Sequence, residues 1–228
     1  MLIVIEGLDG SGKSTQVKML REHLERKYGH CHYIHFPRYE SPVYGEIISR
    51  FLRGEFGAID QVHPQLVALI YAEDRHRAVP DLLRSIGSGM PVLLDRYVYS
   101  NIAYQCAKVH DAEKKEYLRN WIKDTEYGDF KLPVPDVNLF LDVPISFVGS
   151  NLHSQRIGDS DRQYLEGKKD IHETDISFQD AVRREYVRQC ELDGSFVRID
   201  CADASGQIAP AEDVFSRITN ELNRFGIK

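Results

Sequence analysis

Residues 7–14 read Gly7-Leu8-Asp9-Gly10-Ser11-Gly12-Lys13-Ser14 and match the pattern G-x-x-x-x-G-K-S/T at every required position. A short apolar run, Leu2–Ile5, precedes them, and a stretch with helical spacing of apolar residues follows. Glycines let the backbone turn tightly and bring its N–H groups onto phosphate oxygens, and the start of a helix adds a favourable dipole. In such a loop Lys13 reaches the β- and γ-phosphates of a nucleotide, and the Ser14 hydroxyl ligates Mg²⁺.

The rest of the chain alternates short apolar runs with helical stretches. Strands are predicted at Leu2–Ile5, His32–Phe36, Val92–Leu94, Val137–Leu141 and Phe196–Ile199. Helices are predicted at Ser14–Tyr28, Pro42–Leu52, from Pro64 with a break or kink before Pro80, at Asp111–Tyr127 and at Pro210–Phe225. Short apolar strands separated by helices indicate an α/β protein with a five-stranded parallel sheet flanked by helices. Together with the loop, this pattern predicts a P-loop NTPase fold in one domain, residues 1–228.

Composition narrows the class of protein. The 228 residues include 29 Lys and Arg against 35 Asp and Glu, a formal charge of −6, which argues against a dedicated nucleic-acid binder. No run approaches the roughly 18 apolar residues of a membrane span, and the first residues lack the basic region of a signal peptide. Four cysteines are scattered without a C-x-x-C pair. That spacing favours free thiols over a zinc or thioredoxin-type site, so we expect a cytoplasmic enzyme without a membrane partner.

Two adjacent charged residues follow the strand predicted at Val92–Leu94. Asp95 ends that strand, where an acid is suited to organising Mg²⁺ directly or through water. Arg96 follows at once, and a cation beside the metal can clamp a phosphoryl group during transfer. The alternative is a solvated ion pair at the end of a strand. No N-K-x-D run for guanine is present, so the pattern favours phosphoryl transfer over a nucleotide switch.

One segment lacks apolar periodicity. Residues 151–173 are crowded with charge, and we expect them to lie outside the core, either as a mobile lid (about 150–174) or as a surface loop.

Three stretches resemble those of thymidylate kinases, P-loop enzymes that phosphorylate dTMP to dTDP with ATP and Mg²⁺. They are the opening Ile5-Glu6-Gly7-Leu8-Asp9 with its loop, the run Phe36-Pro37-Arg38-Tyr39, and the run Leu93–Gln105 (LLDRYVYSNIAYQ). The resemblance covers nearly the whole chain in order. It implies a cytoplasmic dTMP kinase of dTTP synthesis that binds ATP, dTMP and Mg²⁺ and forms a homodimer.

Site residues follow from the motifs and the resemblance together. The predicted ATP site comprises Gly7, Asp9, Gly10, Ser11, Gly12, Lys13, Ser14 and Thr15. The predicted dTMP site comprises Asp9, Phe36, Arg38, Tyr71, Arg75, Arg96, Ser100, Asn101, Tyr104 and Gln105. Catalysis is expected from Lys13, Asp95, Arg96 and Arg156, and the metal is expected at Ser14 and Asp95.

Several roles are implied by the resemblance. It gives Asp9 the 3′-hydroxyl of the acceptor, although a structural cap is an alternative. Arg38 can hold a phosphate bidentately, and the resemblance assigns it the phosphate of dTMP. Tyr71 and Arg75 are four residues apart and share a helix face. A core tyrosine beside an exposed arginine would explain this spacing, but the resemblance implies a stacking ring and a base-reading guanidinium.

The run Leu93–Gln105 supplies further contacts. Asn101 can pair with the thymine edge, because an amide offers a donor and an acceptor. Many relatives have glycine at this position, so Asn101 fits only one branch of the family. Tyr104 resembles the residue that crowds the 2′ position and favours deoxyribose. Phe36 is expected in the core beside the base, and Gln105 is a weaker candidate for a base contact.

The chain departs from part of the family within the phosphate loop. Some members carry a catalytic arginine there, but this position is Gly10. In the other branch a lid arginine supplies the charge. We therefore expect Arg156 to close over the ATP phosphates, and Arg162 is the second candidate. Asp170 and Glu173 of the same segment either touch nucleotide or metal, or form a solvated face.

The expected nucleophile is a phosphate oxygen of the acceptor, which is mostly dianionic at neutral pH and needs no general base. Another nucleotide kinase, a deoxynucleoside kinase acting on thymidine, and a nucleotide-dependent switch are the competing interpretations. Arg38 favours a monophosphate acceptor, because a nucleoside has no phosphate to engage it.

Overall fold

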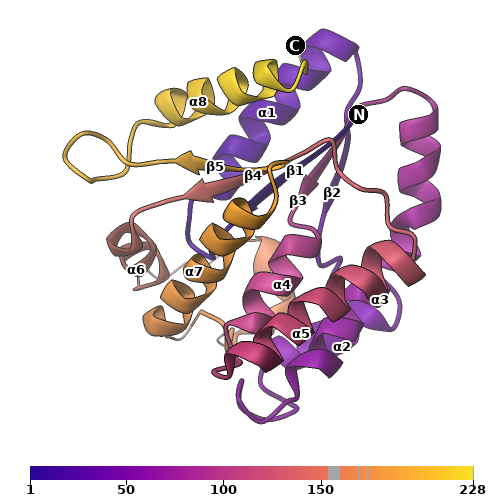
Figure 1. Ribbon diagram of the computed structural model, residues 1–228, viewed down its shortest axis with the longest axis vertical. Helices are drawn as coiled ribbons and strands as arrows, with labels where there is room; N and C mark the ends of the chain where they lie inside the picture. Colours follow the sequence, from indigo (N-terminus) through magenta and orange to yellow (C-terminus); the bar gives the residue numbers. More distant parts are fainter. Residues whose placement is uncertain (154–159, 169, 174, 228) are drawn as a thin grey trace.

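Five parallel strands form one sheet in the order β2-β3-β1-β4-β5 (Figure 1). The strands are β1 (Leu2–Gly7), β2 (His32–His35), β3 (Val92–Asp95), β4 (Val137–Asp142) and β5 (Phe196–Asp200). The computed structural model describes residues 1–153, 160–168, 170–173 and 175–227. The predicted α/β fold with a five-stranded parallel sheet is confirmed.

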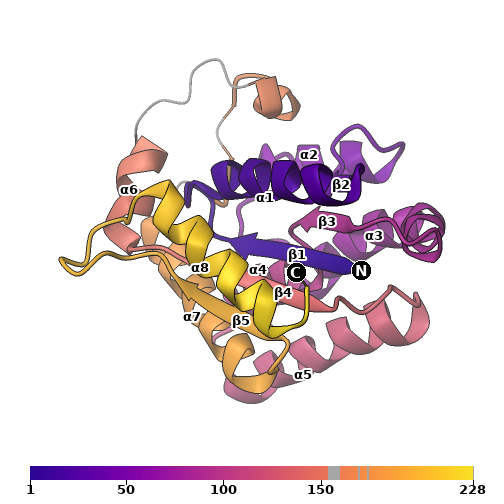
Figure 2. The ribbon, with the colours of Figure 1, turned by 90° about the horizontal axis from the view of Figure 1, so that it is seen from above.

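Helices cover both faces of this sheet. The α-helices are α1 (Lys13–Tyr28), α2 (Tyr44–Leu52), α3 (Pro64–Gly87), α4 (Val98–Cys106), α5 (Ala112–Lys123), α6 (Ile145–His153), α7 (Ile176–Leu192) and α8 (Ala211–Arg224). A π-helix, η1 (Asp124–Asp129), continues α5, and a 3₁₀-helix, η2 (Ser160–Leu165), precedes α7. Helices α1 and α8 pack together on one face, and α4 and α7 pack on the other (Figures 1 and 2).

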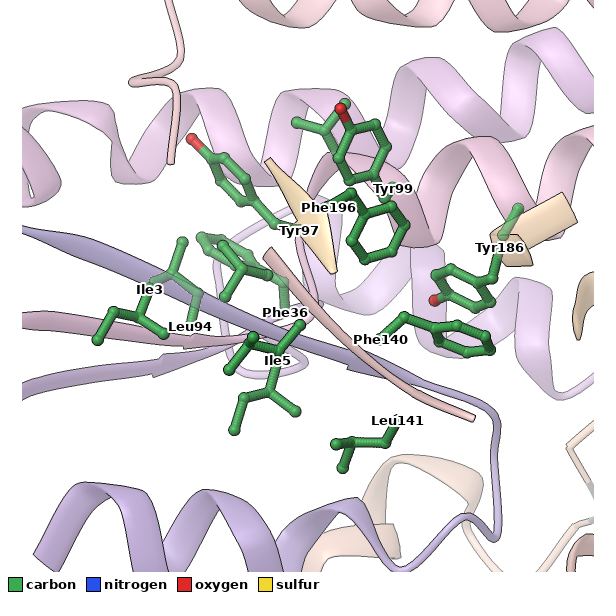
Figure 3. Close-up of a cluster of buried hydrophobic side chains, with 14 of the residues drawn as sticks. Ile3, Ile5, Phe36, Leu94, Tyr97, Tyr99, Phe140, Leu141, Tyr186 and Phe196 are labelled. Carbon is green, nitrogen blue, oxygen red and sulfur yellow. The ribbon is translucent and has the colours of Figure 1, made fainter. Parts of the chain in front are cut away.

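The core lies on both faces of the sheet, because one apolar cluster joins the strands to α1 and α8 on one side and to α4 and α7 on the other. Ile3 and Ile5 of β1 are fully buried, because parallel strands covered on both faces carry apolar side chains throughout. Figure 3 shows rings from distant segments gathered beside them. Phe140 of β4 stacks on Tyr186 of α7 with ring centroids 4.7 Å apart, which joins helix to sheet.

Two predicted helix boundaries differ from the structure. Helix α3 is not broken at Pro80 and continues to Gly87, since Val79 and Leu82 remain buried on its inner face and their packing compensates for the missing N–H of proline. The helix predicted over Asp111–Tyr127 is α-helical only to Lys123 and then widens into η1.

The strand ends determine where a site can form. Because all five strands are parallel, their carboxyl ends share one edge of the sheet, where α/β proteins bind ligands. There β1 and β3 are neighbours, with Ile5 paired to Asp95. The glycine-rich loop and Asp95 therefore meet at this edge. Among the described helices, none has the length and apolar character needed to cross a lipid bilayer.

Candidate active site

The glycine-rich loop joins β1 to the first turn of α1. Gly10 and Gly12 have φ angles of 75° and 73°, a left-handed conformation that side chains with a Cβ rarely adopt. Helix α1 begins at Lys13 directly after this turn, so its amino end faces the loop. Ser11 Oγ is buried and has no hydrogen-bonding partner within the described part of the chain. A loop of this shape, with an unpaired hydroxyl, is suited to receive a phosphate.

Asp95 lies beside Lys13 and His35 at the end of β3. Lys13 Nζ lies 2.6 Å from its Oδ1, and His35 Nδ1 lies 3.1 Å from its Oδ2. Burial alone would raise the pKa of this carboxyl, but Lys13 and His35 hold the pKa below its ordinary value. The group is therefore a carboxylate at neutral pH. Its oxygens and the hydroxyl of Ser14 are the hard ligands that Mg²⁺ prefers, so the donor set fits the ion.

Asp9 is the centre of a hydrogen-bonding network. Arg96 Nη2 donates to its Oδ1 at 2.6 Å, and Tyr104 OH donates to its Oδ2 at 2.7 Å. Gln179 Nε2, from α7, reaches the same Oδ2 at 3.2 Å. Burial opposes the charge of Asp9, but Arg96 and then Tyr104 lower its pKa below the ordinary value. Asp9 thus ties the glycine-rich loop to α4 and α7.

Arg96 adopts a conformation that marks a constrained position. Its φ is 68°, which is uncommon for a residue other than glycine and is typical of sites that need a fixed side-chain direction. Its guanidinium carbon lies 5.1 Å from the centroid of the Tyr104 ring. The chain turns sharply after Asp95 and directs this cation toward Asp9 in the glycine-rich loop.

A cavity opens beside this network. Nine of the ten residues predicted for dTMP line it: Asp9, Phe36, Tyr71, Arg75, Arg96, Ser100, Asn101, Tyr104 and Gln105. Four separate segments supply them, namely the glycine-rich loop, the end of β2, helix α3 and helix α4 with the residues before it. The structure therefore brings together side chains that are up to 96 positions apart in the sequence, as Asp9 and Gln105 are.

Arg38 is the predicted residue that does not line the cavity. Its Nε lies 3.0 Å from Asp74 Oδ1, and its Nη2 lies 2.5 Å from the carbonyl oxygen of Asp74. Its neighbours Pro37 and Tyr39 do line the cavity. Arg38 is therefore held next to the cavity wall by α3.

Arg75 is buried, with 2% of its side chain exposed, so the alternative of an exposed arginine on α3 is wrong. Its Nε and Nη2 lie 2.5 and 2.7 Å from the two carboxylate oxygens of Glu126 in η1. Burial opposes the charge, but Glu126 holds the pKa of Arg75 above its ordinary value. Sequence reasoning missed Glu126, because the π-helix that places it has no recognised sequence pattern.

The charged segment contributes to the cavity instead of standing outside the core. Tyr164 stacks on Tyr39 with centroids 3.7 Å apart, and Asp170 and His172 line the cavity. Asp170 is buried, so a solvated face is wrong for this acid, and burial raises its pKa to about 8 with help from the charges of Asp9 and Glu173. Within the described part of this segment, the expectation that it lies outside the core is wrong at Leu165, which packs into the apolar cluster of α2 and α3.

The expected lid arginines are not placed by the structure. Arg156 lies outside the described residues, and nothing is described of the side chain of Arg162. The preceding helix does contact the glycine-rich loop, since Asn151 Nδ2 in α6 donates to the carbonyl oxygen of Gly10 at 2.8 Å.

Among the residues described, no group of three or more His, Cys, Asp and Glu side chains is placed to hold a metal ion. The four cysteines form no disulfide, and two of them, Cys106 and Cys201, are buried.

Comparison with known proteins identifies the family. The family model described as thymidylate kinase matches residues 5–209. A probable thymidylate kinase of Thermococcus kodakarensis is 32% identical over 197 residues, covering 84% of this chain and 85% of its own length. The thymidylate kinase of Schizosaccharomyces pombe is 30% identical over 227 residues, covering 99% of this chain and 93% of its own length. The solved structure of thymidylate kinase from Candida albicans superposes with a TM-score of 0.73 at 26% identity, covering 99% of this chain and 92% of that one. The chain therefore belongs to the thymidylate kinase family.

Proposed function

We propose that this chain transfers the γ-phosphoryl group of ATP to dTMP, giving dTDP and ADP, as a step in dTTP synthesis. Family membership supports this reaction. The observation that carries it is the junction of the glycine-rich loop with the cavity, because Asp9 belongs to both. A phosphoryl donor on the loop and an acceptor in the cavity would meet beside Arg96.

Charge neutralisation and alignment supply the catalysis. Lys13 lies at the amino end of α1 and neutralises the β- and γ-phosphates, while Arg96 neutralises the group in transfer. The acceptor phosphate has a second pKa near 6, so its oxygen attacks as a dianion without a general base. Mg²⁺, held by Ser14 and by Asp95 directly or through water, would supply further positive charge at the donor phosphates.

The cavity accounts for recognition of the acceptor. Tyr71 is placed to stack on the base, Arg75 to donate to its O4, and Asn101 to meet its N3 edge, with Phe36, Ser100 and Gln105 completing the wall. Tyr104 lies against Asp9 and limits the space for a 2′-hydroxyl, while Asp9 accepts from the 3′-hydroxyl. Arg38 receives the acceptor phosphate beside the cavity wall, with Asp74 fixing the direction of its guanidinium.

A lid arginine completes this proposal. Arg156 or Arg162 folds over the donor phosphates when the segment closes, and such arginines contribute about 10³ to 10⁵ in rate. Arg156→Ala and Arg162→Ala separate the two candidates by kcat. If both variants lose less than about tenfold, the charge comes from another residue.

Assembly and location are further parts of the proposal. We propose a homodimer through helices beside the acceptor cavity, because α3 exposes Leu66 and Leu69 on the helix that carries Tyr71 and Arg75. Light scattering tests it, and a monomer at assay concentrations contradicts it. The four unpaired cysteines support a cytoplasmic location, where thiols stay reduced.

The reaction is tested by coupled ADP release with dTMP, dUMP, dCMP and thymidine as acceptors. We expect the highest kcat/KM for dTMP and ATP turnover that depends on the acceptor. Faster turnover of thymidine than of dTMP would identify a nucleoside kinase instead.

A further inference from the structure

The buried carboxylate of Glu126 holds two residues of the cavity wall at once. Glu126 is fully buried in η1. Its Oε2 accepts from Arg75 Nε at 2.5 Å, and its Oε1 accepts both from Arg75 Nη2 at 2.7 Å and from Asn101 Nδ2 at 2.9 Å. Arg75 and Asn101 line the cavity, whereas Glu126 does not. Glu126 therefore acts from behind the wall.

This contact decides which way the amide of Asn101 faces. Asn101 Nδ2 also lies 2.9 Å from the carbonyl oxygen of Ala68, so both of its hydrogens have acceptors. Neither a carboxylate nor a carbonyl can donate, so the opposite orientation would set the oxygen of Asn101 against two other oxygens. The amide orientation thus follows from the chemistry of its partners. Its oxygen, Asn101 Oδ1, is buried and has no partner in the described part of the chain.

An unpaired acceptor in the cavity wall calls for a ligand that donates. Asn101 and Arg75 both line the cavity, so a base that fills it has to pair with the oxygen of Asn101 and with a guanidinium that is donor only. Thymine and uracil offer an N3–H donor next to the O4 acceptor, which complements the pair. Cytosine offers the reverse, an N3 acceptor next to a 4-amino donor, and would set donor against donor and acceptor against acceptor.

We propose that Glu126 is a positioning residue that fixes Arg75 and Asn101 so that the cavity accepts 4-keto pyrimidine nucleotides and rejects 4-amino ones. This inference rests on the proposed function, since it requires a pyrimidine monophosphate in the cavity. A merely structural ion pair would stabilise the fold without affecting the choice of base.

The first test replaces Glu126 by its uncharged isostere. Glu126→Gln has one side-chain oxygen in place of two. If this oxygen replaces Oε1, the new amide sets an N–H against Arg75 Nε; if it replaces Oε2, the N–H faces both Arg75 Nη2 and Asn101 Nδ2. Both orientations disturb the position of Arg75, and the second also releases the amide of Asn101. We expect the ratio of kcat/KM for dTMP to kcat/KM for dCMP to fall about 10- to 100-fold, because the cavity then leaves polar groups of dTMP unpaired. A folded variant that keeps this ratio within about twofold of the wild type overturns the inference.

A matched control separates selectivity from stability. Glu185 is also a buried carboxylate in an ion pair, with Arg119 Nη2 at 2.7 Å and Lys115 Nζ at 2.6 Å, but it lies outside the cavity. Glu185→Gln is expected to lower the melting temperature as Glu126→Gln does and to leave the dTMP to dCMP ratio unchanged. An equal fall of the ratio in both variants would show loss of packing alone and overturn the inference.

A second variant keeps the test valid if Glu126→Gln does not fold. Asn101→Ala removes the unpaired oxygen and leaves the Arg75–Glu126 ion pair intact. We expect the dTMP to dCMP ratio to fall about tenfold or more, and an unchanged ratio overturns the inference. A wild-type protein that fails to phosphorylate dTMP defeats the proposed function as well. A wild-type protein that phosphorylates dTMP, with variants that keep the ratio, defeats only this inference.

Discussion

Replacing Asp9 by asparagine disrupts the contact between the glycine-rich loop and the acceptor cavity. Asp9 accepts from Arg96 and Tyr104, and from Gln179 at longer range. Asparagine keeps one of the two side-chain oxygens. Its NH₂ group replaces the other oxygen and cannot accept from the donors that were hydrogen-bonded there. A charged or hydroxyl donor therefore loses its acceptor in a site where 11% of the Arg96 side chain and 24% of the Asp9 side chain are exposed.

The expected size follows from these contacts. Leaving one mostly buried donor without its acceptor costs about 1 to 3 kcal/mol. For a chain of this length, about 2 to 4 °C of melting temperature corresponds to each kcal/mol, so we expect a fall of about 2 to 12 °C. If about 2 to 3 kcal/mol of this stabilisation is also lost from the transition state, kcat/KM for dTMP falls about 30- to 150-fold.

Coupled ADP release and thermal unfolding measure the two effects. Asp111→Asn is the matched control, because Asp111 caps α5 by accepting from Lys114 N, outside the cavity, and asparagine caps helices equally well. We expect the control to behave as the wild type. A folded Asp9→Asn variant with kcat/KM within about threefold of the wild type would refute the role given to this network.

Three further outcomes are expected. Lys13→Met removes the cation beside Asp95 and should lower kcat about 100-fold or more in the same assay; a loss below about threefold contradicts its role. Arg38→Met should raise KM for dTMP about tenfold with a smaller change in kcat, and an unchanged KM would place the acceptor phosphate elsewhere. Because the pKa of Asp170 rises from 3.8 to about 8, the folded chain keeps a proton that the unfolded chain releases, so this residue makes stability fall as pH rises from about 4 to 8. Asp170→Asn should flatten the decline of melting temperature between about pH 5 and 8. An identical slope in the variant and the wild type would contradict the raised pKa of Asp170.

Local chemistry explains which parts of the fold were predictable. The glycine-rich loop and the five strands depend on residues adjacent in sequence, so the pattern at residues 7–14 and the short apolar runs predict them well. Helix α3 passes through Pro80 because buried neighbours compensate, and this packing is not visible in the local sequence.

In the cavity too, local sequence predicts some residues, and tertiary packing determines the others. Tyr71 and Arg75 are predictable together, since they are one helical turn apart. Glu126 is not, because its partner Arg75 is 51 positions away and the widening of the helix into η1 follows from tertiary packing. Tyr164 and His172 lie in a segment whose many charged residues predict exposure to solvent. In the structure, the ring of Tyr164 packs against Tyr39 and the ring of His172 packs against Tyr104.

The most direct test of the central claim follows the phosphoryl group itself. ATP labelled at its γ-phosphate is incubated with the protein and Mg²⁺, with and without dTMP, and the labelled products are separated. We expect the label in dTDP, with little free phosphate when dTMP is absent. Label released as inorganic phosphate at the same rate with and without dTMP would contradict the account.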